Sequence, residues 1–305
     1  LGNWFEGSNP SLSASFLCFN TPMNSDIVRN FLEGYSIEVT PNAASKIDNF
    51  AEILPANTRI YIAHIEGTPI EDMVATAKKI SYEGFSPMPH FPARIIKDKK
   101  ILESWIQQYA DEANVKEALL IAGGPKKPYG DFDSSIQLIE TDLFDKFNFK
   151  HLHVAGHPEG NADIDSDGSN TNVNKALSWK NEFSKRTDAS IAITTQFCFD
   201  SETIISWANN LVQMGIDIPV HIGIAGPAKL QTLLRYSMEC GVGASIKILQ
   251  KRAKDITKLL LPYEPSIVIS ELADHKAKNP NFNIDKVHFF PLGGIKTAAS
   301  WVNNI

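Results

Sequence analysis

The sequence predicts an α/β protein, a (β/α)8 TIM barrel with extra helices before the last strand and an N-terminal extension over residues 1–24. The chain has 305 residues and is 43% hydrophobic, which is enough for one large core, and barrels of this class reach this length as one domain. About eight β-rich runs alternate with longer segments of helical spacing. No G-x-G-x-x-G pattern follows the first run, which disfavours a doubly wound open sheet. We therefore expect a single barrel domain over residues 1–305.

The predicted strands are short runs enriched in β-branched and aromatic residues, with polar or turn-forming residues at their ends. Their number and spacing are what an eight-stranded parallel barrel requires. They cover residues 35–39, 59–63, 85–89, 118–122, 151–155, 191–197, 218–224 and 287–291.

The segments between the strands have the apolar spacing of amphipathic helices. The long stretch 225–286 holds about three helical segments, punctuated by Pro262 and Pro265, so we expect extra helices before the last strand. The clearest helical stripes are Ile70, Met73, Val74, Ala77 and Ile80, and then Ile204, Ile205, Ala208, Leu211 and Val212.

Composition narrows the classes of function and the compartment. The net charge of −6 and the pI near 5.8 give no basic footprint for nucleic acid. Cys18, Cys198 and Cys240 lack C-x-x-C spacing, which disfavours a disulfide framework or a zinc site and favours a reducing cytoplasm. We expect no signal peptide and no membrane partner, because no apolar run approaches the roughly 20 residues of a membrane span. A homo-oligomer is left open.

Polar residues and glycines gather at the predicted carboxyl ends of the strands. In a barrel of this class, the active site is built from these ends and the loops that follow them. This shared location is stronger evidence for a site than any single residue. The residues in question are Glu38, His64, His90, Arg94, Gly123, Gly124, His157, Glu159, Gln196, Gly223, Gly293 and Gly294.

Two of these residues carry specific chemical expectations. Glu38 lies between apolar neighbours, which should raise the pKa of its carboxyl and suit a general acid near neutral pH. The alternative is an ion pair with Arg94 or His90 at the rim of the barrel. Gln196 lies in a dense apolar run, and a buried amide must be hydrogen-bonded. Its partner is either the edge of a heterocyclic ligand or neighbouring backbone.

Metal chemistry is disfavoured, although histidines occupy three of the strand ends. His151 and His153 form an H-x-H pair, but the pair begins the fifth strand, whereas a metal-dependent hydrolase needs it at the other end. The last strand also ends without an Asp. Residues 163–168 match the first half of an EF-hand loop, but Asn174 stands where a bidentate Glu is needed. A solvated acidic loop is the better interpretation.

Trp179 and Lys180 lie on the predicted helix after this loop. Trp179 is interpreted as core packing. Lys180 either reaches a phosphate group or belongs to a solvated helix face.

Five segments, in order along the chain, resemble the methylenetetrahydrofolate reductases, which are FAD-dependent (β/α)8 barrels. The resemblance extends from about Tyr35 to Trp301. The segments are 36–41 (SIEVTP), 87–91 (PMPHF), 154–160 (VAGHPEG), 193–200 (ITTQFCFD) and 222–224 (IGI).

The resemblance implies a role for each matching residue. Glu38 would be the general acid for the folate, Gln196 would bind the pterin with Phe197 beside it, and Tyr236 would stack on folate or nicotinamide. FAD would be the cofactor, with NAD(P)H as electron donor or acceptor and folate as the small-molecule partner. The residues implied for FAD are His64, His90, Ala122, Gly123, Gly124, Gly156, His157, Glu159 and Lys180.

Two departures from the family pattern indicate a divergent branch. The segment 121–125 reads IAGGP where the family has L-R-G-D-P, so Gly124 replaces an Asp, and the segment 289–294 (FFPLGG) lacks an Arg. The implied activity is the interconversion of 5,10-methylenetetrahydrofolate and 5-methyltetrahydrofolate in one-carbon and methionine metabolism. The alternatives are a flavin-independent or catabolic barrel that oxidises 5-methyltetrahydrofolate, and a non-catalytic folate-binding barrel.

Overall fold

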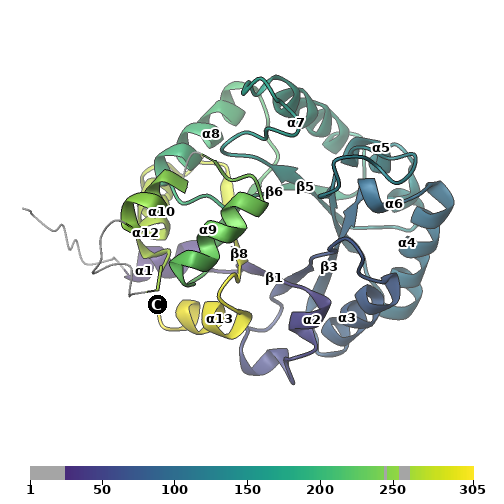
Figure 1. Cartoon of the computed structure of the whole chain (residues 1–305), viewed down its shortest axis with the longest axis horizontal. Helices are drawn as coiled ribbons and strands as arrows, with labels where there is room; N and C mark the ends of the chain where they lie inside the picture. The colour runs from purple at the N-terminus through teal and green to yellow at the C-terminus, as the bar shows by residue number, and fades with distance from the viewer. Residues whose placement is uncertain (1–24, 244–245, 254–261) are drawn as a thin grey trace, which may run out of the picture.

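A computed structural model describes residues 25–243, 246–253 and 262–305 of the chain. The expected N-terminal extension over residues 1–24 lies outside this description. Eight parallel strands form a closed barrel in chain order, and the last strand pairs with the first. The predicted (β/α)8 fold is therefore confirmed (Figure 1). The strands are β1 (Ser36–Val39), β2 (Arg59–Ile62), β3 (Ser86–Pro92), β4 (Glu117–Ile121), β5 (His151–Gly156), β6 (Ser190–Thr195), β7 (Val220–Ala225) and β8 (Ile284–Phe290).

All eight predicted strands are present, with small shifts at their ends. Their sequences are apolar on both faces because the helices cover one face and the closed barrel buries the other. The strand β7 shows this most clearly, since every one of its residues is buried.

Helices surround the barrel and bury their apolar stripes against it (Figure 1). The stripe from Ile70 to Ile80 is buried as predicted, apart from the partly buried Ile70 at its start. The second predicted stripe, from Ile204 to Val212, is buried or partly buried, except for Val212 itself, whose exposed fraction is 56%. The longer helices are α1 (Ser25–Leu32), α3 (Ile70–Tyr82), α4 (Lys99–Ala113), α7 (Thr171–Ser184), α8 (Ser201–Gln213), α12 (Ser266–Lys278) and α13 (Ile295–Asn303).

Shorter elements fill the loops between strands and helices. None of the helices within the described ranges combines the length and the apolar character that crossing a bilayer requires. The short elements are α2 (Pro41–Ala44), η1 (Phe50–Glu52), η2 (Ala93–Ile95), α5 (Ser135–Ile139) and α6 (Leu143–Lys146).

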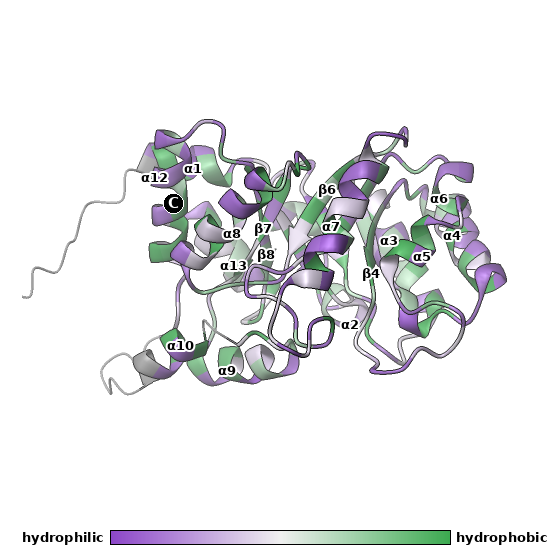
Figure 2. Ribbon diagram, turned by 90° about the horizontal axis from the view of Figure 1, so that it is seen from above, coloured by the Kyte–Doolittle hydropathy of each residue, from purple (hydrophilic) through white to green (hydrophobic). Residues whose placement is uncertain are grey.

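The expected extra helices before the last strand are present. They are α9 (Leu230–Glu239) and α10 (Ile246–Ala253), followed by the longer α12. Figure 2 shows α9 and α10 at the end of the barrel opposite α1 and α12. Since α9 follows the carboxyl end of β7, this helix lies beside the mouth of the barrel, where the site was predicted.

The interior of the barrel contains hydrogen-bonded polar side chains. The Tyr61 hydroxyl of β2 is 2.6 Å from Nδ1 of His153 on β5 and 3.1 Å from Oγ1 of Thr194 on β6. The strand β2 pairs with neither β5 nor β6, so these side chains meet across the barrel interior. All three are at least 96% buried. A barrel of this class is more often filled by branched apolar side chains.

Candidate functional site

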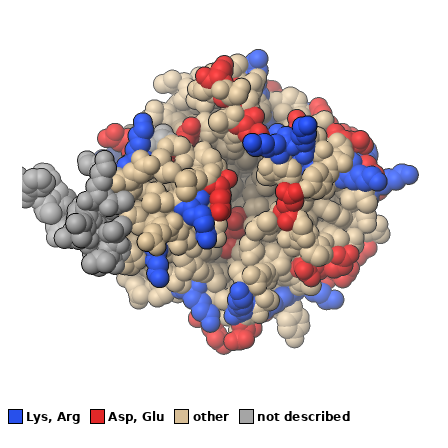
Figure 3. Space-filling view, in the orientation of Figure 1, with Lys and Arg blue, Asp and Glu red and all other residues tan. Residues whose placement is uncertain are grey.

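The candidate site lies at the carboxyl ends of the strands, around a carboxylate held by two histidines. Figure 3 shows a central hollow on this face, with acidic and basic side chains around it. Oε2 of Glu38 is 3.2 Å from Nε2 of His90 and 3.9 Å from Nε2 of His288. These three side chains come from β1, β3 and β8, and the closure of the barrel brings them together.

The expected raised pKa of Glu38 is wrong for this geometry. Burial acts to raise the pKa of the carboxyl, but the charge of His90 and the nearby imidazole of His288 outweigh it and lower the pKa to about 2. Glu38 is therefore a carboxylate at neutral pH. The alternative of an ion pair at the rim is correct for His90 and wrong for Arg94.

Gln196 immediately follows β6, and its amide can bond both to neighbouring backbone and to a ligand. Its Oε1 accepts a hydrogen bond from the backbone N–H of Phe197 at 3.0 Å. Its Nε2 makes no hydrogen bond within the described part of the chain, so two donors remain for a ligand. The backbone beside it is fixed because Thr195 Oγ1 donates to Gln196 O and accepts from Gly223 N at 2.9 and 2.8 Å. A Cβ on Gly223 would approach Thr195 O to 2.3 Å, which explains the glycine.

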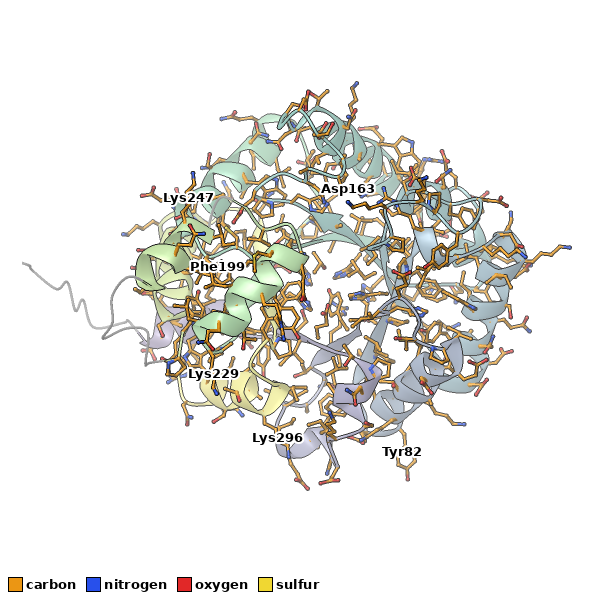
Figure 4. All side chains as sticks on the ribbon, in the orientation of Figure 1. Tyr82, Asp163, Phe199, Lys229, Lys247 and Lys296 are labelled. Atoms are coloured by element: carbon orange, nitrogen blue, oxygen red, sulfur yellow. The ribbon has the colours of Figure 1, made fainter. Side chains whose placement is uncertain are left out.

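An aromatic wall follows Gln196 on the side of the mouth formed by β6 and β8. Phe197 packs edge-to-face against Phe199 and Phe290, with ring centroids 5.6 and 5.4 Å apart. Tyr236 on α9 packs against the same cluster, and the Arg235 guanidinium lies 4.9 Å from its ring centroid. Figure 4 places Phe199 beside α9. Phe197 and Phe199 are only 2% and 3% exposed, so the surface left for an aromatic ligand belongs to the partly buried rings of Phe290 and Tyr236.

Arg94 is the arginine of this rim, and acidic groups already neutralise it. Its guanidinium is 2.8 Å from Asp133 and 2.6 Å from Asp163, and it donates to Pro125 O at 3.1 Å. These charges hold the pKa of Arg94 above its usual value, against the opposing effect of burial. Figure 4 shows Asp163 on the inner side of the ring of helices.

Lys180 is buried, so the solvated-face interpretation of this residue is wrong. Its exposed fraction is 6%, and burial lowers the pKa of its amine to about 8. His157, at the end of β5, has a pKa lowered to about 4, first by burial and then by the charge of Lys180. The expected packing of Trp179 is confirmed, because its ring stacks on Phe183 with centroids 5.8 Å apart.

Several residues expected to bind a cofactor have structural tasks of their own. His64 contacts Thr68 O at 3.0 Å through Nε2 and packs on Trp105. A Cβ on Gly156 would approach Ile193 Cγ2 to 2.4 Å, so this glycine lets β5 and β6 pack closely.

The turn after β4 contains three more of the residues expected at the cofactor. Ala122 O accepts a hydrogen bond from Arg94 N at 2.9 Å. Gly123 has a φ of +98°, which favours glycine, whereas a Cβ on Gly124 would meet nothing within 4 Å. Glu159 is half-buried in the turn after β5.

The acidic loop before α7 is only partly solvated. Asp165 is 3% exposed and accepts hydrogen bonds from the backbone N–H groups of Asn172 and Val173 in the first turn of α7. It therefore acts as a helix cap. Asp163 in the same loop is bound to Arg94.

The residues predicted to bind FAD offer little exposed positive charge to its diphosphate. Such a group needs free cations or backbone donors. The positive charge of Arg94 is shared by Asp133 and Asp163 on the same rim. Lys180 keeps most of its charge at neutral pH, since its pKa is about 8, but it is only 6% exposed. Binding of FAD therefore stays a prediction.

The sequence interpretation missed the polar interior beneath Glu38. Ser36, Tyr61 and His288 were not singled out, although each is at most 2% exposed. The available signal was the two-residue alternation that places Ser36 and Glu38 on one face of β1.

A cavity of about 840 Å³ lies elsewhere, between the loops after β7 and β8 and the start of α12. Its lining includes Lys229, Glu264 and Trp301 and, of the residues predicted at the strand ends, only Gly293 within the described part of the chain. We therefore assign the candidate chemistry to the barrel mouth, where the ionised carboxylate, amide and aromatic wall occur.

No family model matches this chain. The structure is similar to that of an uncharacterized protein from Clostridium thermocellum, which binds two copies of 5-methyl-5,6,7,8-tetrahydrofolic acid. The TM-score is 0.55 with 8% sequence identity, and the match covers 92% of this chain and 98% of the other. At this identity the likeness establishes the fold alone.

Proposed function

We propose that this protein binds a reduced folate at the barrel mouth and interconverts 5-methyltetrahydrofolate and 5,10-methylenetetrahydrofolate, with a nicotinamide as the hydride partner. The observation that carries the proposal is the ionised Glu38, held by His90 and His288 at the same mouth as an amide with unused donors. The folate bound by the structurally similar protein supports the same ligand class.

The polar and aromatic groups suit a pterin. Its ring presents a carbonyl oxygen that the free N–H donors of Gln196 can bind, and its flat face suits the partly buried rings of Phe290 and Tyr236. A site with hydrogen-bonding groups at fixed positions discriminates strongly against ligands that leave those groups unpaired.

The charge of Glu38 favours a base at the start of the oxidative direction. Loss of hydride from the 5-methyl group leaves an iminium cation, which a nearby carboxylate stabilises. N10 of the folate then closes the ring and gives up its proton, which Glu38 accepts. One methyl folate and one oxidised nicotinamide become one methylene folate, one reduced nicotinamide and one proton. In the reductive direction the protonated carboxyl returns that proton to N10.

The proposal contains no flavin step, since Arg94 is already paired with carboxylates and Lys180 is buried. A visible absorption spectrum of the purified protein, before and after addition of FAD, tests this point directly. Flavin absorption that stays with the protein through gel filtration would contradict it.

The activity is tested by calorimetric titration with 5-methyltetrahydrofolate, followed by assay of reduced nicotinamide formation. We expect binding and turnover by the wild type. Glu38→Gln keeps the shape of the side chain and removes the base, so turnover should fall by about 100-fold or more. The exposed Glu71→Gln on α3 is the matched control and should leave turnover unchanged. Binding without turnover in either direction would indicate a non-catalytic folate-binding barrel, and absence of binding would refute the proposal.

A further inference from the structure

We infer that a column of side chains along the barrel axis passes protons between Glu38 and a cavity at the opposite, N-terminal end of the barrel. The inference rests on the proposed function only for its turnover test. It starts from the polar interior, which the fold does not require and which the folate site does not use.

The upper part of the column connects Glu38 to Ser36 on the same strand. His288, which is fully buried, has its Nε2 3.9 Å from Glu38 Oε2 and its Nδ1 hydrogen-bonded to Ser36 Oγ at 2.9 Å. A small rotation that shortens the first distance by about 1 Å would give a hydrogen bond of ordinary length. The Nε2 atom has no hydrogen-bond partner within the described ranges, so it is available for that contact.

The lower part of the column connects Ser36 to His153. The Tyr61 ring packs on His288, the hydrogen-bond partner of Ser36, with centroids 4.2 Å apart. The Ser36 and Tyr61 hydroxyls are near enough to interact but are not hydrogen-bonded, so this link, like that between His288 and Glu38, requires a small rotation. The same hydroxyl is 2.6 Å from His153 Nδ1, and Thr194 Oγ1 lies 2.9 Å from that nitrogen. The side chains therefore follow one another from the mouth to the middle of the barrel.

The column ends at a cavity of about 250 Å³, which is large enough for several waters. His153 and His221 line this cavity and pack edge-to-face with centroids 4.6 Å apart. The cavity lies at the amino ends of the strands, since Arg59, His151 and Ser190 begin β2, β5 and β6 and also line it.

The charged groups around this cavity are largely paired with one another. Glu117 binds Arg59 at 2.5 Å and lies 3.9 Å from His151. Lys286 donates to Glu33 O at 3.2 Å, and Asp285 also lines the cavity. Positive and negative groups are both present, so the cavity can exchange a proton without holding a large charge of one sign.

The protonation states of the column suit transfer rather than storage of a proton. Burial lowers the pKa of His153 and His288, so both imidazoles are neutral and offer one donor and one acceptor. Burial raises the pKa of Tyr61, so its hydroxyl keeps its proton. Each group can therefore receive one proton while it gives up another.

The hops balance in both directions. Toward the mouth, His153 Nδ1–H donates to Tyr61, Tyr61 to Ser36, Ser36 to His288 Nδ1, and His288 Nε2–H to Glu38. His153 recovers its proton at Nε2 from cavity water. Toward the cavity, every hop is reversed, and the proton released by the folate leaves the barrel while the ligand covers the mouth.

The connection can be tested without substrate by imidazole ¹⁵N nuclear magnetic resonance. Glu38→Gln changes the top of the column, and we expect the ¹⁵N shifts of His153 to change in response. The response should be lost when Tyr61→Phe or Ser36→Ala is also present, because each removes one linking hydroxyl. Tyr109→Phe is the matched control, since the Tyr109 hydroxyl is also buried but lies outside the column and has no partner in the described part of the chain.

Turnover provides the second readout. Tyr61→Phe should lower kcat by about tenfold or more and increase the solvent isotope effect, while the Kd for 5-methyltetrahydrofolate stays unchanged. The inference is refuted if Glu38→Gln leaves the ¹⁵N shifts of His153 unchanged. It is also refuted if these shifts change equally when Tyr61→Phe or Ser36→Ala is present, or if Tyr61→Phe leaves kcat unchanged. A wild type without turnover would refute the proposed function, and the resonance experiment would still decide the proton path.

Discussion

Acid titration should measure how much the ionised carboxylate of Glu38 stabilises the folded protein. The structure lowers the pKa of this carboxyl from 4.5 to about 2. Each pKa unit corresponds to about 1.4 kcal/mol, so the folded state gains about 3 kcal/mol from this group when it is ionised. Since the folded pKa is the lower one, this stability is present above pH 4.5 and is lost as the pH falls toward 2.

The assay is urea unfolding of wild type and Glu38→Gln at several pH values. At pH 7 the variant should be less stable by about 3 kcal/mol, and the difference should shrink steadily below pH 4.5. Comparison of the two proteins removes the contribution of the other carboxyls. The reasoning is refuted if the difference does not depend on pH, or if carboxyl resonances give Glu38 a pKa above 4.5.

Three further predictions concern stability. Lys180→Met should stabilise the protein by up to about 3 kcal/mol at pH 7, because the substitution removes a charged amine whose pKa burial lowers to about 8. The gain in stability should disappear above pH 10.5, where the amine is neutral in both the folded and the unfolded protein. An unchanged unfolding curve at pH 7 would contradict this prediction. Gly156→Ala should lower the free energy of unfolding by roughly 1–3 kcal/mol through overpacking. Gly124 has open space around it, so Gly124→Ala should change the free energy of unfolding by no more than about 0.5 kcal/mol. Equal effects of the two substitutions in thermal unfolding would refute this prediction. Asp165→Ala should cost about 1 kcal/mol by removing the cap of α7, while the exposed Asp167→Ala should cost much less, as hydrogen exchange in the first turn of α7 would show.

The fold was predictable because its signal is local and repeated. Each strand and helix has its own apolar spacing, and eight repetitions make the barrel class clear even where single ends shift. The position of the site followed from the fold, since Glu38 and Gln196 come at the ends of their strands. These inferences need only the order of the elements along the chain.

The charge states and the polar interior were not predictable, because they depend on contacts between distant strands. The pKa of Glu38 is set by His90 and His288, which come from β3 and β8. Arg94 meets Asp163 from 69 positions away along the chain. When both faces of a strand are buried, the sequence does not show which residues point inward, so nothing in the sequence singles out Tyr61.

The hydrogen bonds across the barrel interior also bear on how the fold could have been assembled from parts. A cut between β4 and β5 would leave Tyr61 on one fragment and His153 with Thr194 on the other. Tyr61 would lose both of these partners and Ser36 would lose His288, at about 1–3 kcal/mol per unpaired group, whereas His153 and Thr194 would keep each other. Two copies of one half would lack the Tyr61–His153 and Ser36–His288 pairs, because each pair takes one member from each half. The hydrogen bonds across the interior therefore favour association of the two different halves over closure of the barrel by two copies of one half.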